Sequence, residues 1–375
     1  MKKVVIAIDS FKGCLPSAEA GKAAAEGIRS VYPECEVICL PIADGGEGML
    51  DVLIMATNGQ EVPISAHDPL MRWRNTYYGI SENEETAFIE MASISGLPLV
   101  PPERRNPMLT TTYGTGEIIR DALERGCRNF IIGIGGSATN DAGLGMLQAL
   151  GFRFSDKEGK EVGTGRGEVL IKVAHIDSTC VHPALNSCRF TVACDVQNPF
   201  YGPEGAAYVF APQKGADREM VEALDAGLQN FAEVIRHTTG KDISHHPGAG
   251  AAGGMGGSLL AFLNAELKPG IQLMLEALDF SNKIKSADLI ITGEGKADRQ
   301  TLMGKVPSGI LAEARKQNIP VILLAGNIED SDELQQAGFE GVFSVNPPFI
   351  SLEEAMRPEV ARKNIQQTVE SICKK

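Results

Sequence analysis

Polar, glycine-rich segments follow short apolar runs at several points of this sequence, and they carry the side chains best suited to chemistry. The first segment reads Asp9-Ser10-Phe11-Lys12-Gly13. Lys12 offers a cation at the end of an apolar run, and Asp9 can hold a metal or position a hydroxyl. The alternative is an ordinary loop in which Asp9 or Ser10 makes local turn hydrogen bonds.

The second segment is Asp44-Gly45-Gly46-Glu47-Gly48. Its glycines would let a ligand approach the backbone at the N-terminus of a helix, where the N–H groups attract anions. The alternative is local, because Asp44 and Glu47 have the spacing of a capping box.

The third segment, Gly133–Asp141, contains Gly-x-Gly-x-x-Ala between an expected strand and an expected helix. Small residues at this place let backbone N–H groups reach a phosphate. The candidate phosphate-binding residues are Gly135, Gly136, Ser137, Thr139 and Asn140. A tight turn with a helix cap is one alternative. A nicotinamide dinucleotide site is another, although the acid that it requires, Asp156, follows a very short strand.

Two more segments are rich in glycine. Pro247–Gly257 is either a hinge or a place where a ligand comes close to Gly253 and Gly254. Residues 292–300 offer Gly293 and Gly295 for backbone approach, and the carboxylates of Glu294 and Asp298 are of the type that Mg²⁺ prefers. The alternative for this last segment is a solvated charged loop.

Two single residues complete the candidates. Asp195 ends an apolar run and could act as a base for a substrate hydroxyl, or it could be a turn residue ahead of Asn198-Pro199. Lys214 follows soon after, in Gln213-Lys214-Gly215. The histidines and cysteines show no zinc-site spacing, and the best-known phosphate-loop and kinase signatures are missing.

The elements that position these segments alternate between strand and helix at both ends of the chain. Expected strands cover residues 4–8, 36–42, 129–133, 288–292, 320–325 and 341–345, and expected helices cover 17–31, 47–57, 218–237 and 307–317. This alternation of strands and helices predicts an α/β protein with a doubly wound parallel-sheet domain interrupted by a second, mixed α/β domain. We expect residues 1–60, 105–150 and 283–375 in the first and 61–104 and 151–282 in the second. Ligands are expected in a cleft between the two domains, at the carboxyl ends of the strands.

The bulk composition narrows the classes of partner. A net charge of -13 argues against a nucleic-acid binder, which needs a basic face. The same charge means that an anionic substrate needs a local basic pocket. No apolar run is long enough to span a bilayer, and the N-terminal run is too short for a signal peptide, so we expect no membrane partner and a cytoplasmic location. For the oligomeric state, we expect either a monomer or a homodimer.

Read together, the polar segments resemble the glycerate kinase type 1 family. The matching stretches are Asp9–Gly13, Pro41–Gly48, Asp68–Leu70, Thr111–Glu117, Gly135–Asp141, Cys194–Pro199, Ala211–Ala216, Pro247–Gly254 and Thr292–Gly295. They run in the family's order and cover almost the whole chain. The sequence departs from the family at Met71, where glycine is usual, at Ala142, and slightly at Leu15-Pro16-Ser17. Met71 could narrow the pocket for the acceptor.

The resemblance implies a flavodoxin-like domain with an inserted α/β domain, ATP and a divalent metal as cofactors, and glycerate as the substrate. The product implied is 2-phosphoglycerate, although 3-phosphoglycerate has also been assigned within the family. On this basis we expect Asp195, Lys12 and Lys214 to be catalytic, with Glu294 and Asp298 on Mg²⁺. The expected substrate-binding residues are Asp9, Ser10, Asp44, Arg72 and Arg105, since a guanidinium fork matches a carboxylate. The competing hypotheses are a nicotinamide-dependent dehydrogenase and a small-ligand sensor.

Overall fold

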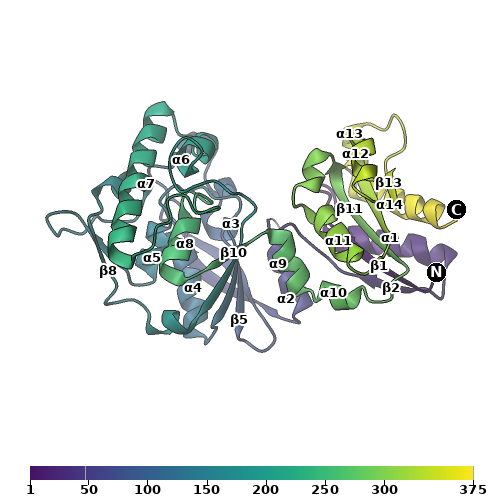
Figure 1. Ribbon diagram of the computed structural model, residues 1–375, viewed down its shortest axis with the longest axis horizontal. Coiled ribbons are helices and arrows are strands. Elements are labelled where there is room, and N and C mark those ends of the chain that lie inside the picture. The colour runs from purple at the N-terminus through teal and green to yellow at the C-terminus, as the bar shows by residue number, and fades with distance from the viewer. Residues whose placement is uncertain (47, 375) are drawn as a thin grey trace. The chain divides into compact units, whose positions relative to one another are not determined.

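The computed structural model describes residues 1–46 and 48–374, which form two compact units (Figure 1). The terminal unit comprises Met1–Asp44 and the chain from Ile271 to the end of the described residues. The central unit comprises Gly45–Gly270. Within the described residues, no helix combines the length and apolar character that crossing a bilayer requires.

The terminal unit is built on a five-stranded parallel sheet with the strand order β13-β12-β11-β1-β2. The strands are β1 (Lys3–Ile8), β2 (Glu36–Cys39), β11 (Leu289–Ala297), β12 (Val321–Ile328) and β13 (Gly341–Ser344). Counted along this unit, the order is 2-1-3-4-5, which is the order of flavodoxin-like sheets. The predicted doubly wound α/β fold is therefore confirmed.

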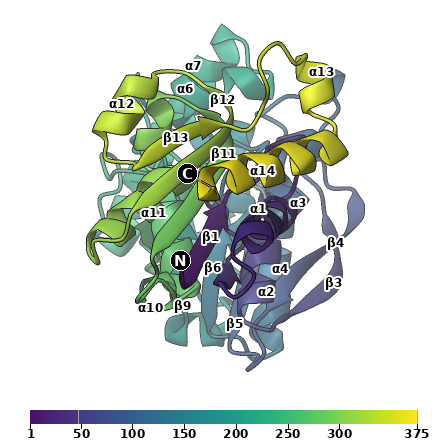
Figure 2. The same ribbon diagram turned by 90° about the vertical axis from the view of Figure 1, so that its right-hand side faces the viewer.

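Helices cover both faces of this sheet because its strands are apolar on both sides. Helices α1 (Ser17–Val31) and α14 (Pro358–Cys373) pack against each other on one face, as Figure 2 shows, and α11 (Val306–Arg315) packs on β11. A Cβ at Gly27 of α1 would lie 2.5 Å from the backbone oxygen of Gln366, so the close packing of α1 on α14 requires glycine there. The shorter helices of this unit are α10 (Phe280–Lys283), α12 (Ser331–Gln336) and α13 (Leu352–Ala355), and α9 (Gly270–Ala277) begins at the unit boundary.

The central unit contains a six-stranded sheet with the order β10-β9-β6-β5-β4-β3. The strands are β3 (Gln60–His67), β4 (Trp73–Ile80), β5 (Thr86–Glu90), β6 (Asn129–Gly133), β9 (Arg189–Ala193) and β10 (Glu266–Lys268). Strands β5, β6, β9 and β10 run parallel, whereas β3 and β4 are antiparallel. A separate antiparallel pair joins β7 (Arg153–Ser155) to β8 (His175–Asp177).

The central unit contains seven α-helices among the described residues. They are α2 (Met49–Ala56), α3 (Ala92–Ser95), α4 (Tyr113–Glu124), α5 (Leu144–Ala149), α6 (Ala206–Phe210), α7 (Arg218–Thr239) and α8 (Met255–Leu263). Helix α7 packs its apolar stripe inward, with Leu224, Leu228 and Phe231 fully buried. The predicted helix at residues 218–237 is therefore confirmed as an ordinary core helix.

The predicted domain boundaries differ from those of the structure. Residues 105–150 were assigned to the domain built from the chain ends, yet β6 pairs with β5 and β9 in the central sheet. The same holds for α2, which packs on β4 and β5. A short apolar strand followed by a helix fits either sheet, and only its hydrogen-bonded neighbours decide between them. The expectation that ligands bind between two domains stays a prediction.

Candidate functional site

A cavity of about 650 Å³ lies at the carboxyl end of the terminal sheet. It is lined from all five strands, by Asp9 and Lys12 after β1, Asp44 after β2, and residues of β11, β12 and the segment after β13. Strand order reverses direction between β1 and β11, because β2 lies on one side of β1 and the later strands on the other. Ligands of open α/β sheets bind at this switch point. The fold therefore predicts a ligand site here.

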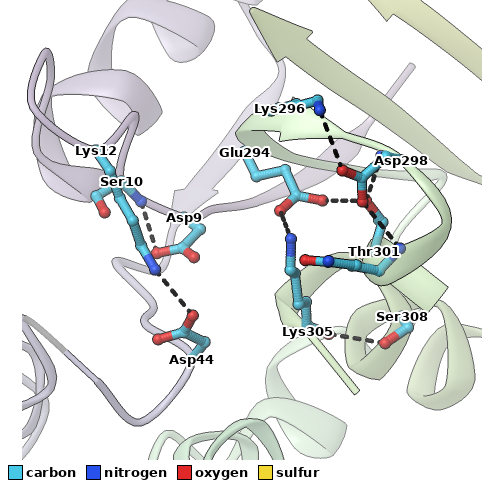
Figure 3. Close-up of polar contacts among 11 residues, drawn as sticks. Asp9, Ser10, Lys12, Asp44, Glu294, Lys296, Asp298, Thr301, Lys305 and Ser308 are labelled. Carbon is cyan, nitrogen blue, oxygen red and sulfur yellow. Dashed lines mark hydrogen bonds and ion pairs between the residues drawn. The ribbon is translucent and has the colours of Figure 1, made fainter. Parts of the chain in front are cut away.

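Three charged residues of this cavity, Asp9, Lys12 and Asp44, follow the first two strands and lie beside one another (Figure 3). Lys12 Nζ lies 3.2 Å from Asp44 Oδ2. Asp9 is almost fully buried, and its Oδ1 accepts a hydrogen bond from the Ser10 N–H at 2.7 Å. Burial, followed by the charge of Asp44, raises the pKa of Asp9 to about 7. The pair Asp9 and Asp44 is therefore an acidic site that a bound cation would stabilise.

Glu294, near the end of β11, faces the same cavity and is held by two residues that the sequence analysis did not identify. Its Oε1 accepts a hydrogen bond from Thr301 Oγ1 at 2.6 Å, and its Oε2 lies 3.6 Å from Lys305 Nζ. Burial raises the pKa of Glu294, and its charge also contributes to the raised pKa of Asp9. Lys305 precedes α11 and has no local motif, so sequence alone offered no signal for it.

Asp298 is predicted to share a metal with Glu294, but in the structure its carboxylate contacts neighbouring residues of the protein. Its Oδ1 accepts a hydrogen bond from the Gln300 N–H at 2.8 Å, and it caps the short helix η6 (Arg299–Leu302). Its other oxygen lies 3.5 Å from Lys296 Nζ, and Asp298 does not line the cavity. The structure thus gives Asp298 a capping role, and its contact with a metal stays a prediction.

The carboxylates of this cavity suit a Mg²⁺ ion that takes its remaining ligands from water and from the phosphates of a substrate. In the parts of the chain that the structure describes, no group of three or more histidine, cysteine, aspartate or glutamate side chains could hold a metal ion by itself. Mg²⁺ commonly keeps several waters and binds through one or two carboxylates plus substrate phosphates. Asp9, Asp44 and Glu294 line one cavity together with the cations of Lys12 and Lys305, which suits a metal–phosphate ligand.

Of the other candidate residues in this unit, some are required for packing and others line the cavity. A Cβ at Gly293 would lie 2.5 Å from the Leu324 carbonyl oxygen, so this glycine serves the packing of β11 on β12. Gly295 and Ser10 line the cavity, and their contact with a ligand stays a prediction. Helix α2 begins at Met49 with Gly48 at its N-cap, so Asp44 does not cap it. The capping box with Glu47 falls on a residue outside those described.

A second cluster lies in the central unit, where Lys214 reaches the loop after β6. Lys214 is buried, and its Nζ donates hydrogen bonds to Ser137 Oγ at 2.8 Å and to the Thr139 carbonyl oxygen at 2.6 Å. Burial lowers the pKa of Lys214 to about 7, against the opposing effect of Asp141. The structure therefore brings the predicted catalytic lysine to the predicted phosphate loop.

The loop itself is fixed by a buried carboxylate and has open space at its tip. Asp141 Oδ2 accepts hydrogen bonds from the N–H and the Oγ1 of Thr112, both at 2.8 Å. At Gly135 no heavy atom lies within 4 Å of an added Cβ, so a ligand can approach the backbone there. The side-chain amide of Asn140 and Oγ1 of Thr139 are buried without a hydrogen-bond partner. Buried polar groups of this kind are the ones that a ligand or water satisfies.

The glycines of the Pro247–Gly257 stretch have a packing explanation. Gly253 has a φ of +68°, and a Cβ there would lie 2.1 Å from the Thr139 carbonyl oxygen. Gly254 has a φ of +91° and faces Leu228 and Phe200. Both glycines let this stretch lie against the loop after β6. Their predicted contact with phosphate stays a prediction.

The same loop does not have the surroundings of a dinucleotide site. Helix α5 begins only at Leu144, several residues beyond Ala138. The strand after it, β7, pairs antiparallel with β8 outside the main sheet, so Asp156 does not end a neighbouring parallel strand. The dehydrogenase hypothesis depended on that arrangement, and the fold removes its support.

The remaining candidates have these surroundings. Asp195 lies two residues beyond β9, at the carboxyl edge it shares with the loop after β6, and its Oδ1 accepts a hydrogen bond from the Gly270 N–H at 2.8 Å. Arg72 is held by buried Asp68, with 2.7 Å from its Nε to Oδ2, so its guanidinium fork is already engaged by a carboxylate. The Arg105 carbonyl oxygen would lie 2.3 Å from a Cβ at Gly215, which places Arg105 beside the Lys214 segment.

The doubly wound sheet with its charged cavity, and the buried lysine beside the loop after β6, are features typical of an α/β enzyme with an anionic ligand. The sequence matches the glycerate kinase family over residues 4–375. The chain is 46% identical over 372 residues to the glycerate kinase of Bacillus subtilis (strain 168), covering 99% of this chain and 97% of that one. It is 47% identical over 356 residues to the glycerate 2-kinase of Escherichia coli (strain K12), covering 95% and 93%.

A solved structure agrees with these relatives. The crystal structure of a protein from Salmonella typhimurium LT2, described as glycerate kinase 2, superposes with a TM-score of 0.91 at 44% identity. The match covers 100% of this chain and 97% of that one. The chain therefore belongs to the glycerate kinase family.

Proposed function

We propose that this protein transfers the γ-phosphoryl group of ATP to D-glycerate and releases 2-phospho-D-glycerate and ADP. Family membership over nearly the whole chain is the observation that carries the proposal. The position of transfer is supported by the relative from Escherichia coli, which is named as a glycerate 2-kinase. Transfer to the 3-hydroxyl, giving 3-phosphoglycerate, is the alternative product that the experiment below separates.

The cavity of the terminal unit supports nucleotide binding. Its volume of about 650 Å³ lies within the roughly 300–1,000 Å³ of pockets for drug-sized ligands, well beyond the needs of a small hydroxy acid alone. Lys12 and Lys305 supply positive charge for phosphates. Asp9, Asp44 and Glu294 supply carboxylates for Mg²⁺, which when bound would neutralise charge on the phosphate oxygens. We assign Mg²⁺ to these three residues in preference to Asp298.

The reaction needs a hydroxyl to be oriented and its proton to be accepted. In the proposed step the glycerate hydroxyl oxygen forms a bond to the γ-phosphorus, the bond from that phosphorus to the β,γ-bridging oxygen breaks, and the hydroxyl proton passes to a base. Asp195 is the proposed base or orienting group. Lys214 is proposed to stabilise negative charge, since a buried ammonium acts strongly where water is excluded.

We further propose that the protein works in the cytoplasm. All eight cysteines are free thiols, and Cys35, Cys127, Cys194 and Cys373 are buried. Free thiols persist in reducing compartments. The burial of half of them agrees with their use as small apolar core residues.

The test is direct. The purified protein is incubated with ATP, Mg²⁺ and D-glycerate, and the phosphorylated acid is identified by phosphorus and proton NMR. We expect 2-phosphoglycerate, with the phosphorus coupled to the single proton on carbon 2. Coupling to the two protons on carbon 3 would establish the alternative product. ADP formation that does not depend on glycerate would refute the proposed substrate.

A further inference from the structure

The cavity of the terminal unit has two chemically different ends. Its charged end carries Asp9, Lys12 and Glu294. Its other wall comes from the segment after β13 and carries Pro347, Pro348, Ile350, Leu352 and Met356. The acids in that segment, Glu353 and Glu354, do not line the cavity. Phosphates and a metal account for the charged end only, so the apolar wall requires a different part of the ligand.

The apolar wall is uncovered in the terminal unit. Leu352 is 76% exposed and Met356 is 40% exposed, although both line the cavity. When a ligand covers large apolar side chains that are exposed to water at a cavity, the buried apolar surface makes the free energy of binding more favourable. A ligand with a flat apolar face would supply that cover.

The start of the segment that carries this wall is anchored by the protein's own contacts. The Val345 N–H donates to the Ala325 carbonyl oxygen at 2.9 Å, and Asn346 Nδ2 donates to the Gly326 carbonyl oxygen at 2.8 Å. Asn364 of α14 donates in turn to Asn346 Oδ1 at 3.2 Å. The segment after β13 is therefore anchored to β12 and α14 before any ligand arrives.

The apolar wall also adjoins the charged end. Met356 Cε would lie 3.3 Å from a Cβ at Gly13, which has a φ of +73° and follows Lys12 directly. The Cys14 thiol lies 3.9 Å from the Ala355 carbonyl oxygen. A single ligand can thus place a charged group near Lys12 and an apolar ring against Met356.

We propose that this apolar wall, formed by Pro347, Pro348, Ile350, Leu352 and Met356, binds the purine base of the nucleotide whose phosphates lie at the charged end. The inference rests on the proposed function, because it takes the ligand to be ATP. A purine ring has two apolar faces for Ile350, Leu352 and Met356, and glycerate has none. The polar edges of the ring can meet the side-chain amide of Asn327, which also lines the cavity.

The test compares a nucleotide with a ligand that has phosphates but no base. Binding of ADP and of inorganic tripolyphosphate, each with Mg²⁺, is measured by isothermal titration calorimetry on the full chain. The variant is Leu352→Glu, which puts a charge on the apolar wall at the first position of α13, where an acid suits the helix. The matched control is Phe349→Glu, in the same segment, fully exposed and outside the cavity.

We expect Leu352→Glu to weaken ADP binding by about tenfold or more, the order of one lost apolar contact, and to leave tripolyphosphate binding within about twofold. Phe349→Glu should change neither. Equal weakening of both ligands would show a charge effect on the phosphates, and unchanged ADP binding by Leu352→Glu would show that the base lies elsewhere; either result overturns the inference. A wild-type protein that binds ADP at this wall but forms no phosphoglycerate would refute the proposed function and leave this inference standing.

Discussion

Lys214 and Ser137 are 77 residues apart in the sequence, yet Lys214 Nζ donates a hydrogen bond to Ser137 Oγ at 2.8 Å. The ammonium is completely buried in the central unit, and burial lowers its pKa to about 7. A lysine that titrates near neutral pH is poised to change its protonation when an anion arrives.

Ligand binding at pH 8 should be accompanied by uptake of a proton on Lys214. The free lysine, with a pKa of about 7, is mostly neutral at that pH, and a nearby anion favours its charged form. The heat of binding MgADP with D-glycerate is measured by calorimetry in HEPES and in Tris, whose ionisation enthalpies differ. We expect different heats for the wild type and a much smaller difference for Lys214→Met. Equal heats in both buffers for the wild type would contradict the prediction.

Much of the fold followed from local patterns. The apolar runs at 4–8 and 129–133 gave β1 and β6 to within one residue, and the stripe on residues 218–237 gave α7. The observed ends of β2, β11 and β12 differ from the predicted ones by three to five residues. Helix α14 was not predicted, although its apolar residues Ala361, Ile365 and Val369 have helical spacing. The signal was present there and was missed. The strand at 129–133 was placed in the wrong domain because strand pairing depends on residues far away in the sequence.

The candidate site divides in the same way. Asp9, Lys12, Asp44 and Glu294 were predicted because each follows or ends a strand, and they do line one cavity. Thr301 and Lys305 were not predicted, because their relation to Glu294 arises only when the chain turns back into α11. The apolar wall after β13 was also missed, since Pro347-Pro348 reads as a plain loop. Gly253, predicted for phosphate, packs on the Thr139 backbone, and its contact with phosphate stays a prediction.

Replacing Asp9 with Asn should change how stability depends on pH. The folded pKa of about 7 exceeds the ordinary 3.8, so protonated Asp9 contributes stability that is fully present below about pH 3.8 and is lost as the pH rises through about 7. Asp9→Asn lacks this loss. The free energy of unfolding of Asp9→Asn minus that of the wild type should therefore grow by about 3 kcal/mol from pH 5 to pH 8.

Urea unfolding followed by circular dichroism at the two pH values measures this change. The matched control is Asp177→Asn in the central unit. The exposed Asp177 has a lowered pKa because the Thr179 N–H donates to its carboxylate at 2.8 Å, so its titration is complete below pH 5. Its difference from the wild type should be the same at both pH values. A constant difference for Asp9→Asn as well would show that Asp9 is not held at a raised pKa.

Replacing Asp195 with Asn should leave the fold intact and remove most turnover. The amide keeps an oxygen that can accept the Gly270 N–H, while it loses the basicity that the proposed step requires. We expect kcat to fall by roughly 10²–10⁴-fold, the range for loss of a general base, with nearly unchanged ADP binding. The assay couples ADP release to NADH oxidation, with Asp177→Asn as the surface control. Turnover within about twofold of the wild type would remove Asp195 from the mechanism.

Replacing Glu294 with Gln should weaken the dependence of ADP binding on Mg²⁺. Thr301 can still donate to the amide oxygen of Gln, so the local contact survives while the negative charge that would hold the metal is lost. For the wild type we expect Mg²⁺ to tighten ADP binding by about tenfold or more over EDTA, a difference of about 1.4 kcal/mol. Glu294→Gln should show less than half of that free energy.

Asp298→Asn should keep the full effect, because Asp298 caps η6 and lies outside the cavity. Glu329→Gln, an exposed acid paired with Lys296, is the matched control. A full Mg²⁺ effect in Glu294→Gln together with its loss in Asp298→Asn would place the metal at Asp298 and remove Glu294 from it.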